Sequence, residues 1–243
     1  MDLITLSNIV ECTIVYRESL FTVVVSIGNE VKKAHLINTG RLKDYLASGK
    51  KGFCIPIART RSGLEYRLVG VEDNGYAAIV DTKLHEKSFE VLLSKNIVPW
   101  LENCVLTRRN VFVYNSRIDY EARCKDKKVL IEIKSAVMRF QNGFAGYPDA
   151  PTQRGKKHLD SLAKYVSNNM GLAYIVFVAA IPHAKGFSLY CDADKSICKH
   201  VLNALRSGVQ FKSINIYLDV EKKGIVYGDL DLPIDLSCCE TNI

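Results

Sequence analysis

Residues 117–136 read RIDYEARCKDKKVLIEIKSA. Two strand-like runs flank the tripeptide KDK at 125–127, which predicts a β-hairpin. Because side chains alternate between the two faces of a strand, Glu132 and Lys134 share one face, and the neighbouring isoleucines take the other. A charged face in so apolar a strand is either the solvated side of an antiparallel sheet or part of a metal-dependent active site.

The whole chain has the composition of an ordinary globular protein. Its 243 residues are 48% hydrophobic and 24% charged, which allows one large domain or two small ones. The net charge of +7 suits a polyanionic partner such as nucleic acid, although many basic proteins bind none. The longest apolar run, LAYIVFVAAIP from Leu172, is too short to span a bilayer, and the first residues lack the basic start of a secretory signal. We therefore expect a cytoplasmic protein without membrane contact.

Eight cysteines are scattered along the chain, and none belongs to a C-x-x-C pair. This spacing argues against a zinc site. We expect most of the cysteines to be reduced thiols, several of them in the core, whereas a hyperthermophilic source would allow intracellular disulfides. The adjacent Cys238 and Cys239 lie near the C-terminus, and we interpret their pairing in the sequence as incidental.

Residues 1–80 predict a small β-barrel domain. Strand-like runs cover most of residues 12–38 and 53–80, and RLKDYLASG at 41–49 predicts one short helix that ends at Gly49. Five or six strands with one short helix fit a closed barrel of the OB type. Such barrels bind oligonucleotides or oligosaccharides, but the fold alone does not define a function.

Residues 81–243 predict an α/β domain. An amphipathic helix at 87–96 precedes three strand-like runs, of which the last two form the hairpin. A second helix at 152–169 carries an apolar stripe, a short apolar strand follows at 173–180, and a further helix and strand complete the pattern. The fold class is thus α+β or α/β, with an OB-type barrel before an α/β domain.

The hairpin brings acidic residues together. If it turns near Asp126, Asp119 lies across from Lys134, and the two share a face with Glu132 and Glu121. Two close carboxylates repel each other, and a cation such as Mg²⁺ or Mn²⁺ removes that conflict. A metal-bound water and a neighbouring lysine suit phosphodiester hydrolysis. A plain cross-strand salt bridge explains the same spacing.

A second group of candidate residues lies in GYPDAPTQRGKKHL at 146–159. Thr152 predicts a helix N-cap, and a helix start is a natural phosphate site. The side chains of Arg154, Lys157 and His158 fall on the polar side of this helix. They predict contacts with a nucleic-acid backbone, and the alternative is a solvated basic face.

Two further features give weaker indications of a binding site. In AHLINTGRLKDYL at 34–46, Gly40 allows a close backbone approach, and Arg41 and Lys43 could contact phosphate. The alternative is an ordinary loop between a strand and a helix. Asp149 is either an additional metal ligand or a turn residue that bonds its own backbone.

The chain resembles the sugar fermentation stimulation protein A family from about residue 12 to residue 220. The segments that carry the resemblance are HLINTGRL (35–42), VDTKL (80–84), SRIDY (116–120), IEIKS (131–135) and YPDAPTQRGKKHL (147–159). The resemblance implies an N-terminal OB fold and a C-terminal domain like the PD-(D/E)xK nucleases. It assigns Asp119, Glu132 and Lys134 to the three signature positions, and Glu90 to the acidic position of the first core helix.

The sequence departs from the family pattern in two places. The family usually has an R-P-N-R-F-like stretch in its first strands, where this chain reads RESLF at 17–21. The P-N that the family has near the first helix is His85-Glu86 here. The first departure bears on ligand contacts at the barrel, and the second on a local loop.

The resemblance implies a DNA-binding protein with a nuclease-like metal site and a link to the regulation of sugar catabolism. The first hypothesis is a Mg²⁺- or Mn²⁺-dependent phosphodiester hydrolase, in which Asp119 and Glu132 bind the metal. The alternative is a non-catalytic DNA-binding regulator of sugar metabolism on a nuclease scaffold. An oligosaccharide-binding module is a third reading. A homodimer would suit a nuclease acting on duplex DNA.

Overall fold

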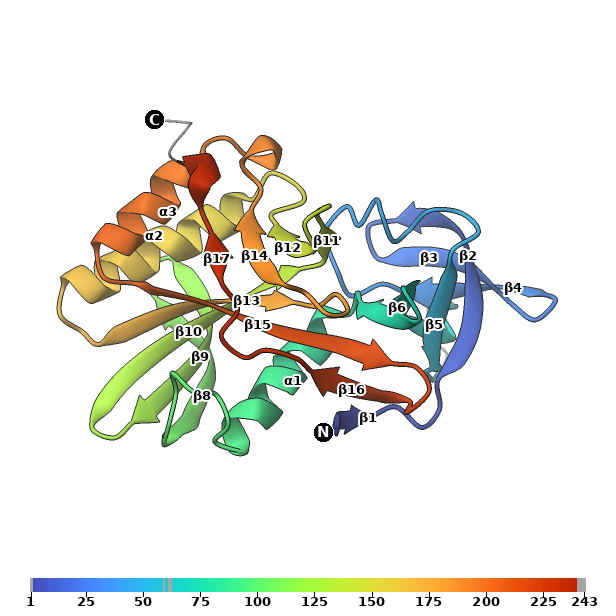
Figure 1. Cartoon of the computed structure of the whole chain (residues 1–243), viewed down its shortest axis with the longest axis horizontal. Coiled ribbons are helices and arrows are strands. Elements are labelled where there is room, and N and C mark those ends of the chain that lie inside the picture. The colour runs from blue at the N-terminus through green and yellow to red at the C-terminus, as the bar shows by residue number, and fades with distance from the viewer. Residues whose placement is uncertain (1, 59, 61–62, 240–243) are drawn as a thin grey trace.

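A computed structural model describes residues 2–58, 60 and 63–239 (Figure 1). Among these residues, five strands form a closed barrel at one end of the molecule: β2 (Val10–Ser19), β3 (Thr22–Ile27), β4 (Glu30–His35), β5 (Lys51–Pro56) and β6 (Tyr66–Asp73). They pair antiparallel in the order β4-β3-β2-β5-β6, and a parallel contact between β4 and β6 closes the barrel. The predicted OB-type barrel is therefore confirmed.

The segment between β4 and β5 is not the short helix that residues 41–49 predict. It forms a single turn in which the amides of Tyr45 and Leu46 donate to the carbonyl oxygen of Leu42. Leu42 has a φ of 50°, outside the helical region, and its amide donates to Oδ2 of Asp149 at 2.9 Å. A tertiary contact thus replaces the helical hydrogen bonds, and the helix prediction is wrong.

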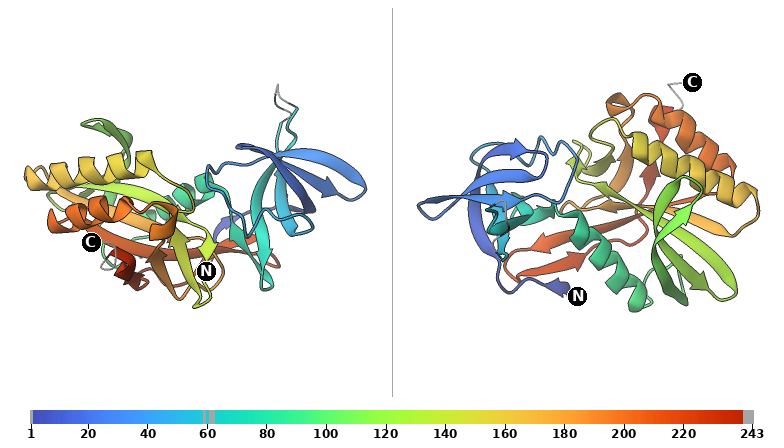
Figure 2. Two further views of the ribbon diagram at one scale, coloured as in Figure 1. Left: turned by 90° about the horizontal axis from the view of Figure 1, so that it is seen from above. Right: turned by 180° about the vertical axis from the view of Figure 1, so that it is seen from behind.

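The remainder of the chain folds as an α/β domain. Its core sheet has the order β8-β9-β10-β13-β15, formed by β8 (Cys104–Val113), β9 (Ser116–Cys124), β10 (Lys127–Ala136), β13 (Leu172–Ala179) and β15 (Gln210–Asp219). Strands β10, β13 and β15 are parallel, whereas β9 is antiparallel to both of its neighbours. Helices α2 (Gln153–Ser167) and α3 (Ile197–Arg206) lie together on one side of the sheet, and α1 (Thr82–Ser94) lies on the other (Figures 1 and 2). This arrangement confirms the predicted α/β domain.

The barrel and the α/β domain share one continuous sheet. Strand β7 (Tyr76–Ile79) pairs with β6 and contacts β15 through Ala77 and Leu218. The N-terminal strand β1 pairs with β16, far along the chain. The remaining strands are β1 (Asp2–Thr5), β16 (Gly224–Tyr227), β11 (Met138–Arg139), β12 (Phe144–Tyr147), β14 (Gly186–Leu189) and β17 (Ile234–Asp235). The predicted division after residue 80 falls between β7 and α1, but the first strand lies with the sheet of the second domain.

The hairpin of β9 and β10 differs from the predicted register by two residues. Cys124 pairs with Lys127 and Tyr120 with Ile131, so that Asp119 lies opposite Glu132 rather than opposite Lys134. A shift of two residues keeps every side chain on its face. The predicted convergence therefore survives the error in register.

The cysteines are less reduced than the sequence predicts. Disulfides join Cys104 to Cys124, which are opposite each other on β8 and β9, and Cys191 to Cys238. Half of the eight cysteines are therefore oxidised, and the prediction of mostly reduced thiols is wrong. The pairing depends on long-range contacts that the spacing of cysteines does not reveal.

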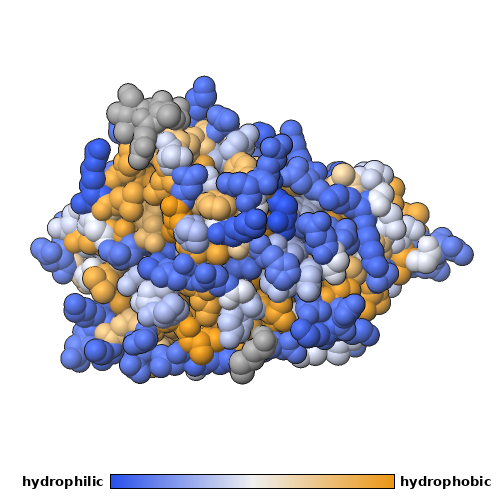
Figure 3. All heavy atoms as spheres, in the orientation of Figure 1, coloured by the Kyte–Doolittle hydropathy of each residue, from blue (hydrophilic) through white to orange (hydrophobic). Residues whose placement is uncertain are grey.

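Hydrophilic side chains cover much of the face drawn in Figure 3, and apolar ones form separate patches among them. Within the described part of the chain, no helix is long and apolar enough to cross a membrane.

Candidate functional site

A pocket of about 310 Å³ opens where the barrel meets the α/β domain. Residues 38–40 of the barrel form one wall, and the loop from β12 to the start of α2 forms another. The floor is made by the adjacent ends of β9 and β10, with Asp119, Glu132 and Lys134. The structure therefore brings these three sequence-predicted residues together in one concave site.

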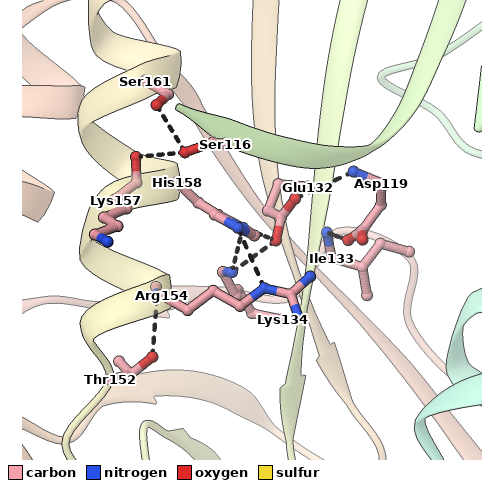
Figure 4. Close-up of polar contacts among 11 residues, drawn as sticks. Ser116, Asp119, Glu132, Ile133, Lys134, Thr152, Arg154, Lys157, His158 and Ser161 are labelled. Carbon is pink, nitrogen blue, oxygen red and sulfur yellow. Dashed lines mark hydrogen bonds and ion pairs between the residues drawn. The ribbon is translucent and has the colours of Figure 1, made fainter. Parts of the chain in front are cut away.

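Hydrogen bonds hold the two carboxylates in place (Figure 4). The amide of Asp119 donates to Oε2 of Glu132 at 3.2 Å, and the amide of Ile133 donates to Oδ2 of Asp119 at 2.8 Å. The ammonium of Lys134 donates to Oε1 of Glu132 at 2.7 Å. These bonds take the place of the regular ladder where the two strands diverge, and they fix the three side chains around one point.

His158 completes this network from α2. Its Nδ1 contacts Oε1 of Glu132, and Nε of Arg154 donates to its Nε2 at 3.3 Å. The guanidinium can only donate to Nε2, which corresponds to the tautomer with its proton on Nδ1, directed at Glu132. In that tautomer the ammonium of Lys134, 3.2 Å from the same Nδ1, donates to Glu132 and not to the histidine. The histidine therefore orients the carboxylate and connects it to the exposed Arg154 at the surface.

The two carboxylates differ in their acidity. Burial, and then the charge of Glu132, raises the pKa of Asp119 to about 7. Burial would raise the pKa of Glu132 too, but Lys134 and His158 outweigh it, and the net shift is downward. Glu132 also raises the pKa of Lys134 against the effect of burial. Glu132 is therefore the permanent anion of the site, and Asp119 gains or loses a proton near neutrality.

The structure does not bring Glu90 to the pocket. Its carboxylate forms a bidentate ion pair with Arg109 on a different part of the surface, where Nε and Nη2 donate to the two carboxylate oxygens at 2.7 and 2.8 Å. Glu86, one helical turn earlier on α1, lines the pocket instead. Partial burial and the charge of Glu90, followed by that of Glu132 among others, raise the pKa of Glu86.

The sequence does not show which part of α1 lines the pocket, and the resemblance therefore pointed to Glu90 and not to Glu86. Asp81 is the N-cap, since its side chain accepts from the amides of Lys83 and Leu84. Residues 82, 85 and 86, in the turns that follow, line the pocket. Glu86 lies four residues before Glu90 and therefore on the same helical face, and this spacing was the sequence signal that could have pointed to Glu86.

The predicted N-cap of α2 is confirmed, but His158, predicted on the basic face of this helix, is buried against Glu132. Oγ1 of Thr152 accepts from the amide of Gly155 at 3.0 Å, which makes Thr152 the N-cap. Arg154 lines the pocket, whereas Lys157 faces a neighbouring depression that it shares with Arg117 and the exposed ring of Phe112. Sequence reasoning missed Arg117 and Phe112. They face each other across the hairpin of β8 and β9, far from α2 in the sequence.

Asp149 joins the two domains. Besides binding the amide of Leu42, it packs against Gly40, where a β-carbon would lie 2.6 Å from Oδ2. Arg41 and Lys43 line a separate depression between the barrel and the α/β domain, and neither lines the pocket of Asp119 and Glu132. Arg17, in the stretch that departs from the family pattern, donates to the carbonyl oxygen of Gly40 at 2.6 Å.

The pocket offers oxygen donors of the kind that hard divalent cations prefer. Asp119 and Glu132 offer carboxylate oxygens, and Glu86 is a third carboxylate in the lining of the pocket, although these three do not lie as close together as the cysteine sulfurs described below. Mg²⁺ prefers one or two carboxylates with waters and phosphate oxygens as its remaining ligands. The pKa of Asp119 is raised by burial and by the negative charge of Glu132, and the positive charge of Lys134 offsets this only in part.

Comparisons with known proteins agree with this fold. Family models described as the sugar fermentation stimulation protein RE domain and the SfsA N-terminal OB domain match residues 83–222 and 15–80. A sugar fermentation stimulation protein homolog from Pyrococcus furiosus is 34% identical over 234 residues, 96% of this chain and 100% of its own length. One from Archaeoglobus fulgidus is 36% identical over 218 residues, 89% of this chain and 92% of its own.

A solved structure supports the same relationship. The structure of Pyrococcus furiosus SfsA in complex with Ca²⁺ has 33% sequence identity and a TM-score of 0.92, and the match covers 97% of this chain and 100% of that chain. The likeness extends through both the barrel and the α/β domain. The chain therefore belongs to the sugar fermentation stimulation protein family.

Proposed function

We propose that this protein is a divalent-cation-dependent nuclease that acts on DNA. The observation that carries the proposal is the convergence of Asp119, Glu132 and Lys134 in one pocket, with Glu132 almost fully buried. Two carboxylates this close repel each other, and a bound cation would offset that repulsion. The Ca²⁺ complex of the Pyrococcus furiosus relative supports a divalent cation as the partner.

Each group has a distinct role in this proposal. Asp119 and Glu132 hold Mg²⁺ or Mn²⁺, with Glu86 as an additional ligand. When bound, the ion lowers the pKa of a coordinated water and offsets charge on the phosphoryl group. Lys134 stabilises the negative charge that develops during hydrolysis, and its ion pair with Glu132 fixes its position. His158 keeps Glu132 oriented.

The surface beside the pocket suits a nucleic-acid backbone. Arg154, Lys157 and Arg117 surround the neighbouring depression, and Phe112 at its edge is 75% exposed. The guanidinium carbon of Arg117 lies 5.5 Å from the centre of the Phe112 ring. Cationic side chains neutralise phosphates, and an exposed ring can stack on an unpaired base. We propose that this surface guides DNA to the pocket.

A non-catalytic DNA-binding protein on the same scaffold is the second candidate. The observation that favours it is the closed network of Lys134, Glu132 and His158, because the buried charges already satisfy one another. A role in regulating sugar metabolism would belong to this second candidate.

Cleavage assays with purified protein separate the two candidates. Single-stranded, duplex and forked DNA are incubated with the protein and Mg²⁺ or Mn²⁺, beside a Glu132→Gln variant. Cleavage that needs both the metal and Glu132 supports the nuclease. Salt-dependent DNA binding without cleavage of any substrate rejects the nuclease and favours the second candidate. If the protein neither binds nor cleaves DNA, both candidates are rejected.

A further inference from the structure

Four cysteine sulfurs gather at the end of the molecule opposite the barrel. Cys191 begins the short helix η1 (Cys191–Ala193), Cys198 lies on α3, and Cys238 and Cys239 close the helix η2 (Ser237–Cys239), next to the C-terminal end in Figure 1. All four sulfurs lie within 4.8 Å of one another. Within the described part of the chain, no other group of three or more histidine, cysteine or acidic side chains is so closely grouped.

The cluster is largely shielded from solvent, and only Cys238 is partly exposed. Three of the cysteines are at most 3% exposed: Cys191, Cys198 and Cys239. The sulfur of Cys191 lies 2.8 Å from that of Cys198 and 3.9 Å from that of Cys239, and it is bonded to Cys238. A disulfide alone would need two of these residues and leaves two further thiols packed against it. The fold thus collects twice as many sulfurs as one disulfide uses.

Four thiolates at this separation suit one tetrahedral metal ion. In a structural zinc site the Zn–S bonds are about 2.3 Å, which places the sulfurs roughly 3.8 Å apart. An iron–sulfur cluster would hold its cysteines further apart, because iron and sulfide ions lie between them. Sulfur donors also select a different metal from the oxygen donors of the carboxylate pocket. Four protein ligands leave no open position for a substrate, which is typical of a structural site.

We propose that the reduced protein binds one Zn²⁺ ion through Cys191, Cys198, Cys238 and Cys239. The ion takes the place of the disulfide, since Cys191 and Cys238 cannot form both. It ties the C-terminal segment to α3 and to η1. The signal was hidden in the sequence because the ligands come from three separate elements and no pair has zinc-finger spacing.

The site also bears on the candidate active site. Asp194, three residues after Cys191, accepts from the amide of Thr152 at 3.0 Å and pairs with Lys156 at 3.0 Å. These contacts fix the first turn of α2, which carries Arg154. A metal ion at the cysteines would therefore hold the segment that anchors this helix.

The test measures metal content in protein purified and kept under a phosphine reductant. Elemental analysis and native mass spectrometry are expected to find one Zn²⁺ per wild-type chain. The Cys198→Ser and Cys239→Ser variants are expected to lose it. The matched control is Cys54→Ser, which alters a buried thiol of the barrel and is expected to keep the ion.

Cobalt titration of the reduced wild-type protein decides the question even if the serine variants fail to fold. Co²⁺ in a four-thiolate site gives intense sulfur-to-metal absorption and visible bands of tetrahedral geometry, and Zn²⁺ displaces it. Absence of these bands, with no zinc retained from an excess, overturns the proposal. Zinc that persists in both serine variants overturns it too, and so does bound iron with inorganic sulfide in place of zinc.

Discussion

The ammonium of Lys134 lies 2.7 Å from Oε1 of Glu132, and both side chains are almost completely buried. They are two positions apart on β10 and therefore project from the same face. Asp119 approaches the pair from β9, so that one positive and two potentially negative groups meet at the open end of the hairpin, away from its turn. This arrangement explains why so apolar a strand carries charge, and it defines the most informative substitutions.

Replacing Lys134 by methionine is expected to lower DNA cleavage by about 10²- to 10³-fold, because the developing negative charge loses its stabilising group. Metal binding is expected to persist, since both carboxylates remain. Cleavage rates and calorimetric Mg²⁺ titration measure the two effects separately. Lys87→Met, on the exposed side of α1, is the control. Equal cleavage by Lys134→Met and the wild type would exclude a catalytic role for this lysine.

The two acidic residues of α1 give a direct comparison. Glu86→Gln is expected to weaken Mg²⁺ binding by about tenfold, as the loss of an auxiliary charged ligand would. Glu90→Gln removes an exposed ion pair with Arg109 and is expected to leave Mg²⁺ binding unchanged. Calorimetry on both variants checks this. The opposite ranking would restore Glu90 as the acidic residue of the site.

The raised pKa of Asp119 makes the metal-free protein sensitive to pH. The folded state holds the proton up to about pH 7, whereas an unfolded aspartate releases it near pH 4. The folded state thus binds more protons than the unfolded state between these pH values. The contribution of the Asp119 carboxyl to stability is therefore present at low pH and is lost as the pH rises toward 7. In EDTA, Asp119→Asn is expected to gain stability relative to the wild type over that range.

Urea unfolding at several pH values measures this difference. A stability difference between Asp119→Asn and the wild type that stays constant from pH 4 to pH 7 would show that the carboxyl has an ordinary pKa.

The contact between Gly40 and Asp149 predicts non-additive effects. Gly40→Ala places a methyl group 2.6 Å from the Asp149 carboxylate, and Asp149→Ala leaves the amide of Leu42 without its acceptor. Each change is expected to cost about 1–3 kcal/mol. In the double variant the carboxylate is gone, so the alanine at position 40 fits at less cost. Chemical denaturation of the four proteins measures the coupling, and strict additivity would contradict it.

The basic surface beside the pocket predicts a salt effect. Arg117→Ala and Lys157→Ala are each expected to weaken DNA binding and to reduce the slope of log K against log salt by about one. Lys222→Ala, on the turn between β15 and β16, is the control. DNA affinity measured by fluorescence anisotropy at several salt concentrations tests this. An unchanged slope in both variants would place the DNA elsewhere.

Local patterns in the sequence were enough to predict the barrel, the hairpin and the charged face of β10. The pairing of Asp119 with this face survived an error of two residues in register, because alternation has a period of two. The cap of α2 at Thr152 was also predictable, since a capping side chain bonds only to nearby amides.

Long-range contacts decided the rest. Only the packed structure shows that α1 presents Glu86 to the pocket, that Asp149 replaces a helix at residues 41–49 with a turn, and that cysteines far apart in the chain converge. The sequence by itself determined which residues alternate, cap and turn, because these preferences act over a few residues. The tertiary structure decided which of those residues meet, because strand register and helix placement depend on packing between distant segments.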